Sequence, residues 1–175
     1  VSGDTRMVAA AGAEDLYAPV AADVFDGDRA TAKVAILAVL YGATSGDARP
    51  LLPLLRSRFP VAVDYVETAA RAGERGEVVR SWLGRACPPP EDGFHEHGDA
   101  RARGRFTRNF VVQATAAEWA LCVLAELRRR LTTDPDRSVG ELVFFQHDEV
   151  VVHTANPSAA IAHIEASVAV ATRLL

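Results

Sequence analysis

Apolar residues recur at helical spacing through most of the first hundred positions. The stretch "AEDLYAPVAADVF" is amphipathic up to a "DGD" break, and "RATAKVAILAVLYG", residues 29–42, predicts a second, more apolar helix that Gly42 stops. Two further helices are predicted within residues 48–76, and Pro60 opens the second of them. The stretch "GRACPPPEDGFHEHGD" is rich in Pro, Gly and acidic residues, so it predicts an exposed linker and the best internal boundary.

The second part of the chain changes from helical to strand-like patterns. A long Ala-rich helix is predicted over residues 105–131, and "ELVFFQ" and "VVVHT" predict the strands of a hairpin over residues 141–154. "PSAAIAHIEASVAVATRLL" predicts a final helix. The expected fold is α+β and mostly helical, with residues 1–100 forming one part and residues 101–175 the other.

Composition sets the broad class of the protein. With 175 residues, of which 49% are hydrophobic, the chain predicts one domain with a real core rather than a disordered protein. Charged residues interrupt every apolar run before about 18 positions, and the first residues lack the order of a signal peptide, so we expect no membrane segment and a cytoplasmic location. Cys87 and Cys122 are far apart, which predicts packing roles.

Charge is uneven along the chain, although the formal net charge is only -4. Arginines cluster in "RARGRFTR" and in "RRR" at residues 128–130, whereas Lys33 is the single lysine. A net acidic chain does not suit a protein coated with positive charge for nucleic acid, but local basic patches remain possible partners for it. The simpler interpretation of each cluster is a solvated basic face.

The helix at residues 29–42 carries one strip of possible ligand-binding side chains. Arg29, Lys33, Leu37 and Tyr41 follow each other at intervals of four, so each lies one turn above the last. Both cations fall in the first turns, where the helix dipole and free backbone N–H groups favour an anion, and Tyr41 lies roughly 18 Å further along the axis. The spacing fits a helix that binds a nucleotide, with phosphates at one end and the base or sugar at the other. The alternative is an amphipathic helix whose polar first turns are simply exposed to solvent.

The long helix repeats this spacing with Arg105, Asn109 and Gln113. A guanidinium and two amides on one strip can donate to phosphate, sugar and base-edge acceptors in a minor groove. Ordinary solvent-facing polarity is the alternative.

Three titratable residues, His147, Asp148 and Glu149, interrupt the predicted hairpin. An unpaired carboxylate taken out of water costs several kcal/mol or more, so these residues mark either an exposed turn or a site that meets a cation. Neighbouring strand residues point to opposite faces, so one carboxylate is the primary ligand. Mg²⁺ is commonly held by one or two carboxylates together with substrate phosphates.

Together these three elements resemble the polymerase domain of family A DNA polymerases, the DNA polymerase I type. Arg29, Lys33, Tyr41 and Gly42 match that family's motif B, "RFTRNFVVQATAAE" is similar to its R-x3-N-x3-Q-G-T-A-A-D segment, and "QHDE" is similar to its motif C. Within the family the chain looks closest to bifunctional 3'-5' exonuclease/DNA polymerases of bacteria. The resemblance implies partial fingers over residues 1–100, and a partial palm after them with the motif C hairpin.

The resemblance also implies a function and a partner set. It implies template-directed transfer of a nucleotide from dNTP to a primer 3'-OH, with two Mg²⁺ ions, in DNA replication or repair, by an enzyme that is a monomer when complete. The implied site residues are Asp148 as metal ligand and catalytic group, Glu149 and Lys33 as further catalytic groups, Arg29, Lys33, Leu37, Tyr41 and Tyr17 at the nucleotide, and Arg105, Asn109, Gln113 and His147 at the DNA.

Several positions depart from the family pattern. Leu37 stands where the family commonly has Phe or Tyr, Ala114 replaces a Gly, and Tyr17 stands where many relatives have His. The family's first catalytic carboxylate lies in a D-x-S-Q-x-E-x-R motif, and no Ser-Gln pair occurs in the chain. We therefore expect a truncated fragment without activity of its own. Two alternatives are a single-subunit phage-type RNA polymerase, which typically has Ser where Glu149 stands, and a DNA-binding remnant without catalysis.

Overall fold

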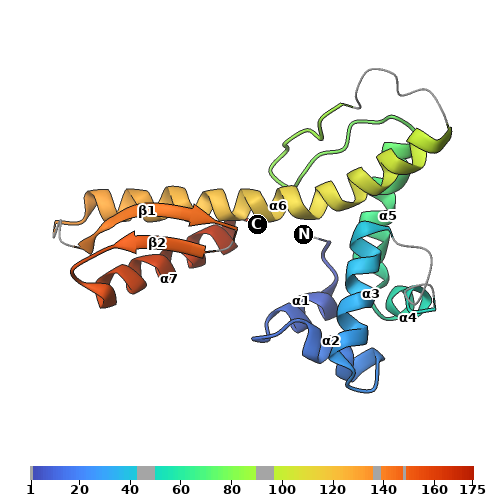
Figure 1. The fold of residues 1–175 in the computed structure, drawn as a ribbon, viewed down its shortest axis with the longest axis horizontal. Coiled ribbons are helices and arrows are strands. Elements are labelled where there is room, and N and C mark those ends of the chain that lie inside the picture. The colour runs from blue at the N-terminus through green and yellow to red at the C-terminus, as the bar shows by residue number, and fades with distance from the viewer. Residues whose placement is uncertain (1, 43–49, 90–96, 136–138, 148) are drawn as a thin grey trace. The chain divides into compact units, whose positions relative to one another are not determined.

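The computed structural model describes residues 2–42, 50–89, 97–135, 139–147 and 149–175. The chain forms two compact units, Val1–Ala114 and Thr115–Leu175, each with its own hydrophobic cluster. The helices and strands, in chain order, are α1 (Thr5–Ala11), α2 (Tyr17–Val24), α3 (Arg29–Tyr41), α4 (Leu52–Arg58), α5 (Pro60–Glu74), α6 (His97–Thr133), β1 (Glu141–Gln146), β2 (Glu149–His153) and α7 (Pro157–Leu174) (Figure 1). The predicted fold class, mostly helical with a β-hairpin, is confirmed.

Helix α3 begins and ends where its sequence predicts. Asp28 caps its start, because its carboxylate oxygen Oδ1 accepts the backbone N–H groups of Ala30 and Thr31 at 3.0 and 3.1 Å. Gly42 ends the helix with a φ of 68°, a left-handed conformation that costs Gly little. Three of the five buried residues of α3 are alanines, Ala32, Ala35 and Ala38, and the other two are Ile36 and Val39.

The structure adds one helix that was not predicted and moves the start of another. The helix α1 was not predicted, although Asp4 marks its start by accepting the N–H groups of Arg6 and Met7. Helix α6 begins at His97 rather than Arg105. Residues 97–104 lack an apolar stripe, but Ala and Arg have high intrinsic helix propensity, and the helix continues through them.

The boundary between the two compact units lies inside α6, after Ala114. The first half of α6 belongs to the first unit because it packs on α5. Thr107 is fully buried there and its hydroxyl donates to the carbonyl of Ala69 at 2.8 Å. A Cβ placed on Gly73 of α5 would lie 2.1 Å from Thr107 Oγ1, so the two backbones cross at a distance that only Gly permits.

The expectation that no segment is long and apolar enough to cross a membrane is wrong for α6. By length and composition alone, the span Ala100–Thr133 within the described residues meets that description. Between Arg108 and Arg128 the only charged residues are Glu118 and Glu126. Core helices of soluble proteins have the same composition, and α6 supplies residues to both hydrophobic clusters.

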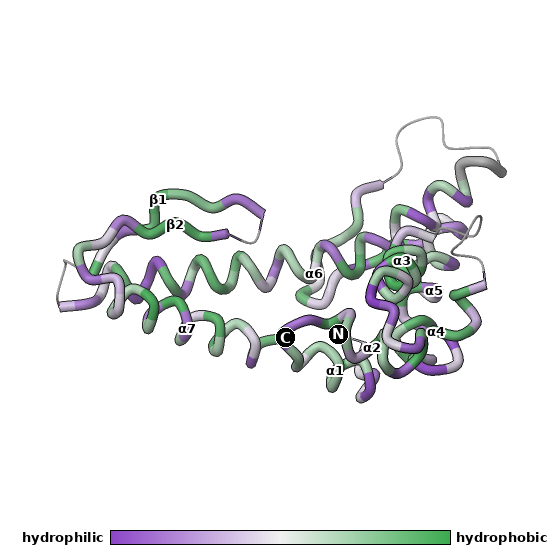
Figure 2. The backbone as a smooth tube through the Cα atoms, turned by 60° about the horizontal axis from the view of Figure 1, so that its bottom comes forward, coloured by the Kyte–Doolittle hydropathy of each residue, from purple (hydrophilic) through white to green (hydrophobic). Residues whose placement is uncertain are grey.

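In the second unit the hairpin lies on α6 and α7. Leu127 and Leu131 of α6 form the buried centre together with Val139. The partly buried apolar residues that pack against this centre are Leu142, Val150, Val152, Ala159 and Ile164. The strands pair antiparallel, and a bulge between Leu142 and Phe144 shifts the register. Much of both strands is hydrophobic (Figure 2).

The other face of the hairpin is exposed and apolar. Val143, Phe144 and Val151 are 59%, 56% and 50% exposed. Within the described residues β1 and β2 pair only with each other. An apolar face and two open strand edges are features that promote association with other chains.

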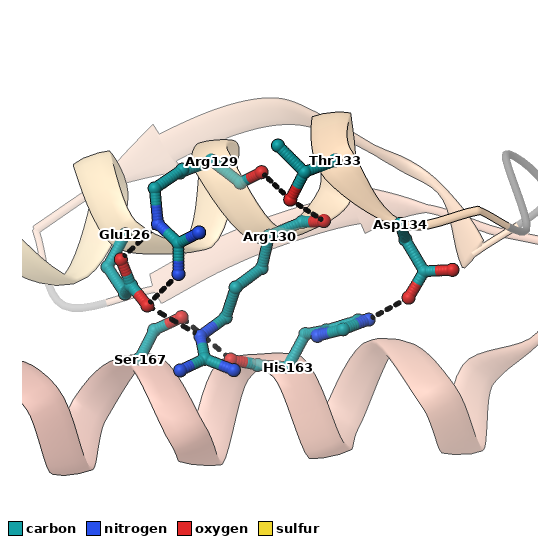
Figure 3. A network of polar contacts seen from close by, with 7 residues as sticks. All are labelled: Glu126, Arg129, Arg130, Thr133, Asp134, His163 and Ser167. Atoms are coloured by element: carbon teal, nitrogen blue, oxygen red, sulfur yellow. Dashed lines mark hydrogen bonds and ion pairs between the residues drawn. The ribbon is translucent and has the colours of Figure 1, made fainter.

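A polar network joins α6 to α7 in this unit (Figure 3). Glu126 accepts two hydrogen bonds from Arg129 at 2.7 Å each, and Arg130 Nε lies 2.8 Å from the same carboxylate as an ion pair outside hydrogen-bond geometry. Hydrogen bonding from Arg129, with the charge of Arg130, lowers the pKa of Glu126 to about 2. One turn beyond, Asp134 Oδ2 lies 2.8 Å from Nε2 of His163 on α7. The "RRR" cluster is therefore largely engaged within the protein.

Candidate functional site

The strip on α3 is a surface feature of the first unit. Arg29, Lys33 and Tyr41 are exposed, and Leu37 is half-buried between them. Because the opposite side of α3 is packed into the core, these four side chains share the face that a ligand can reach. The structure thus places the four predicted residues of this helix along one accessible line.

Arg29 and Tyr17, both predicted at the nucleotide, are brought together by Asp15. Arg29 Nε donates to Asp15 Oδ2 at 2.5 Å, and Asp15 Oδ1 also accepts the backbone N–H of Tyr17 at 3.0 Å. The Arg29 guanidinium lies over the Tyr17 ring, 5.3 Å from its centroid. The hydrogen bond from Arg29 lowers the pKa of the Asp15 carboxyl, so the pair stays charged at neutral pH.

Asp15 is a site residue that the sequence reasoning missed. Its signal was present, since an Asp two residues before a helix commonly binds a first-turn N–H group. Its effect is to fix the Arg29 guanidinium beside Tyr17.

The first turn of α3 differs from the sequence prediction in one respect. The backbone N–H groups of Ala30 and Thr31 are not free for an anion, because the Asp28 carboxylate occupies both. A hydrogen bond from the Thr31 hydroxyl, 2.6 Å from Asp28 Oδ2, lowers the pKa of Asp28 further toward the charged form. An anion at this end therefore depends mainly on side chains.

Lys33 is the cation best placed for that role. It is exposed, it lies one turn from Arg29, and it makes no hydrogen bond or ion pair with the residues that the structure describes. A strongly hydrated ammonium group without a protein partner can bind phosphate as a point charge.

The far end of α3 meets the first half of α6. A Cβ on Gly42 would lie 3.1 Å from Arg105 Cγ and 3.5 Å from Arg108 Cδ, so Gly42 packs closely against α6, and its φ of 68° favours glycine. Arg108 Nη1 donates to the carbonyl of Val39 at 2.9 Å and satisfies one of the last carbonyls of α3. The predicted strips of the two helices therefore approach each other at the Tyr41 end.

The strip on α6 is partly accessible. Arg105 and Gln113 are exposed and Asn109 is half-buried. The Asn109 amide nitrogen is buried and has no hydrogen-bond partner among the described residues. An unsatisfied buried donor costs about 1–3 kcal/mol, so this amide favours an added acceptor at that position.

The arginine-rich segment does not form one basic face. Arg103 is buried, with its guanidinium 5.4 Å from the centroid of the Phe106 ring, and Arg108 is largely buried against α3. Burial lowers the pKa of Arg108, and the Glu67 carboxylate 4.0 Å away opposes that shift. Arg101 and Arg105 are the exposed members of the cluster.

The hairpin tip carries the third constellation. Gln146 pairs with Glu149 at the end of the hairpin. His147 is exposed and has a φ of 56°, so it takes the left-handed position that Gly or Asn often fills in such loops. Glu149 is exposed on the side of β2 opposite to Val150, which faces the core.

Asp148, the predicted metal ligand, lies outside the described residues. Among the residues that are described, no group of three His, Cys, Asp or Glu side chains is arranged to hold a metal ion. The magnesium site therefore stays a prediction.

Comparison with models of protein families and with curated proteins gives no match. Among solved structures, the chain is similar to the POL domain of Pol1 from M. smegmatis, in a complex with DNA primer-template and dNTP, with a TM-score of 0.81 and 19% sequence identity. The match covers 97% of this chain and 34% of that one. The fold is thus that of a piece of a DNA polymerase domain. The division into partial fingers and a partial palm stays a prediction.

Proposed function

We propose that this chain is part of a template-directed DNA polymerase, which transfers a nucleotide from dNTP to the 3'-OH of a primer. The observation that carries the proposal is the line of Arg29, Lys33 and Tyr41 on the accessible face of α3, in a chain with the fold of a DNA polymerase domain. Primer-template DNA and dNTP are the proposed partners, and both are named for the similar structure.

In this proposal α3 binds the incoming nucleotide. Arg29 and Lys33 neutralise the triphosphate, and the Tyr41 end lies toward the base and sugar, next to α6. Lys33 also gives a proton to the departing pyrophosphate, a role that Arg cannot take because it keeps its proton. Tyr17, whose ring lies against Arg29, lines the triphosphate end of α3. Leu37 lies beside the sugar.

The α6 strip and the hairpin tip are proposed to hold the nucleic acid. Arg105, Asn109 and Gln113 donate to acceptors in the minor groove of the primer-template duplex, and the unsatisfied Asn109 amide is a donor suited to such an acceptor. His147 contacts the primer backbone from the exposed tip. These contacts would sense the shape of the duplex rather than its sequence.

Asp148 is the proposed metal ligand, supported by Glu149. Hard carboxylate oxygens are the ligands that Mg²⁺ prefers, and two such ions, when bound, would supply the charge neutralisation of phosphoryl transfer. We also propose that the complete enzyme is a monomer and that it acts in DNA replication or repair in the cytoplasm.

Primer extension by the full gene product tests this function. We expect template-dependent, Mg²⁺-dependent extension that EDTA abolishes and that Asp148→Asn reduces by orders of magnitude, while affinity for primer-template stays nearly unchanged. Asp26→Asn is the matched control, because Asp26 is exposed and its φ of 50° suits Asn equally well. Full activity in Asp148→Asn would contradict the proposed role. DNA binding without any extension would favour a non-catalytic DNA-binding protein.

The 175-residue chain by itself is expected to incorporate no dNTP, because it contains no Ser-Gln pair and so no match to the first carboxylate motif. It should bind DNA weakly and with strong salt dependence. The exposed apolar face at Val143, Phe144 and Val151 should make it poorly soluble. Primer extension by this chain, lost in Asp148→Asn, would mean that its own residues supply both metal-binding arms.

A further inference from the structure

Asp15 joins the segment before α2 to the first turn of α3 through one carboxylate. Its Oδ2 accepts a hydrogen bond from Arg29 Nε at 2.5 Å, and its Oδ1 accepts one from Arg29 Nη2 at 3.3 Å. Oδ1 also accepts the backbone N–H of Tyr17, the first residue of α2, at 3.0 Å. The same carboxylate therefore binds the start of α2 and sets the direction of the Arg29 guanidinium.

The Arg29 guanidinium is restrained on one edge and on one face. Nε and Nη2 form the edge that binds Asp15, and the centroid of the Tyr17 ring lies 5.3 Å from Arg29 Cζ. A guanidinium carries five N–H donors, so two of them are used by Asp15 and three remain, on Nη1 and on Nη2. Those three make no hydrogen bond with the residues that the structure describes, and the Arg29 side chain is 56% exposed.

The remaining donors have the arrangement that a phosphate group binds. Two parallel N–H groups on the Nη1–Nη2 edge of an arginine match two oxygens of one phosphate. The edge bound to a carboxylate and the edge open to solvent are different edges of the same planar group. Asp15 can therefore hold Arg29 without occupying the donors that face a ligand.

We propose that Asp15 is a positioning residue for nucleotide binding, which holds Arg29 so that its Nη1–Nη2 edge is presented to the triphosphate of dNTP. This role rests on the proposed function of α3, because it acts through the contact between Arg29 and the triphosphate. A long side chain loses rotamer freedom when it binds a ligand, and Asp15 and Tyr17 remove much of that freedom before dNTP arrives. Lys33 needs no such support, since an ammonium group binds phosphate as a point charge.

A carboxylate beside an anion site also repels the anion, which is the opposite effect. By repulsion alone, Asp15→Asn would tighten the binding of a triphosphate. The geometry favours positioning, because Asp15 lies at the Nε edge and not at the open edge of Arg29. Both side chains are in contact with water, where repulsion between separated charges is weak. We therefore expect Asp15→Asn to weaken dNTP binding.

Single-turnover incorporation by the full gene product, over a range of dNTP concentrations, tests the role of Asp15. Asp15→Asn keeps an oxygen that can accept the N–H of Tyr17, but it replaces an acceptor for Arg29 with an amide donor. We expect the apparent Kd for dNTP to rise about fivefold, which is the upper end for an exposed ion pair. The maximal rate should stay within about twofold of the parent, because Arg29 contacts the triphosphate before as well as during the reaction.

A double-mutant cycle separates positioning from a folding defect. In an Arg29→Gln background, Asp15→Asn should change the dNTP Kd by less than about 1.5-fold, because the group through which Asp15 acts is gone. A purely structural role at the start of α2 would give the same change with and without Arg29. Asp23→Asn is the matched control and should leave both the Kd and the rate unchanged. Asp23 also binds one arginine and is similarly exposed, at 31% against 36% for Asp15, but its partner Arg58 ends α4.

Three outcomes would overturn the role of Asp15. They are an unchanged dNTP Kd in Asp15→Asn, tighter dNTP binding in that variant, and an equal effect of Asp15→Asn in the Arg29→Gln background. Tighter binding would mean that Asp15 withholds Arg29 from the triphosphate. All three are seen in a gene product that extends primers, whereas a parent protein that extends none refutes the proposed polymerase function and the role of Asp15 with it, so the two failures are distinguishable.

Discussion

Gly73→Ala is expected to destabilise the first unit through the crossing of α5 and α6. The added methyl group would lie 2.1 Å from Oγ1 and 2.7 Å from Cγ2 of Thr107. Ordinary contact is 3.4–4 Å, so the helices must separate by about 1 Å or the Thr107 side chain must leave its position. Either change disturbs the hydrogen bond from Thr107 to the carbonyl of Ala69.

Three terms set the magnitude. Overpacking of this kind costs about 1–3 kcal/mol. Loss of the Thr107 hydrogen bond adds about 1 kcal/mol, and the higher helix propensity of Ala returns about 1 kcal/mol. The net loss is about 2 kcal/mol in the free energy of unfolding, which lowers the Tm of a chain of this size by about 4–8 °C.

Thermal and urea unfolding measure this loss. Because two units can unfold separately, a Trp119→Phe background lets the emission of Trp82 report the first unit alone. Gly12→Ala is the control, since its φ is -74° and the nearest atom to the new Cβ is at 3.4 Å, an ordinary contact. If Gly73→Ala were as stable as Gly12→Ala, the close crossing of the two helices would be wrong.

Three further changes test other parts of the chain. Asp4→Ala should lower the free energy of unfolding in urea titrations by about 1–3 kcal/mol, because it removes the cap of α1 and the acceptor, at 3.1 Å, for the N–H of Ala62. An unchanged urea midpoint would contradict the stabilising role of Asp4. The pKa of Glu126 is about 2 in the folded chain against 4.5 ordinarily, so the ionised carboxylate stabilises the fold fully above about pH 4.5, and this stabilisation is lost as the pH falls toward 2. Glu126→Gln should therefore flatten the pH dependence of the urea midpoint in that window. A variant whose midpoints run parallel to those of the parent would refute the role of Glu126. Lys33→Arg in the gene product should keep dNTP affinity yet slow single-turnover incorporation, and equal rates would exclude proton donation by Lys33.

Strong local patterns made α3 and the hairpin predictable. Helix α3 has a clear apolar period, an Asp before its start and Gly42 at its end, so its sequence alone places both termini. The two apolar runs in "ELVFFQ" and "VVVHT", separated by only a few residues, likewise predict the pairing of β1 with β2. The bulge at Val143 has no such signature, because it depends on how the strands settle on the Leu127 cluster.

Contacts between distant parts of the chain were not predictable. Asp15 meets Arg29 across 14 positions, and Arg108 meets Val39 across 69 positions. Such pairs depend on tertiary packing, which the local spacing of a single sequence does not contain.

The bond from Arg108 to the end of α3 has a mechanical consequence. The Arg108 side chain is 17% exposed, so a rotation of α3 away from α6 would leave a desolvated guanidinium without its 2.9 Å acceptor, at a cost of about 1.5–3 kcal/mol. The Arg105 side chain lies close to Gly42 at the same junction. The bond from Arg108 therefore opposes any rotation that separates α3 from the first half of α6.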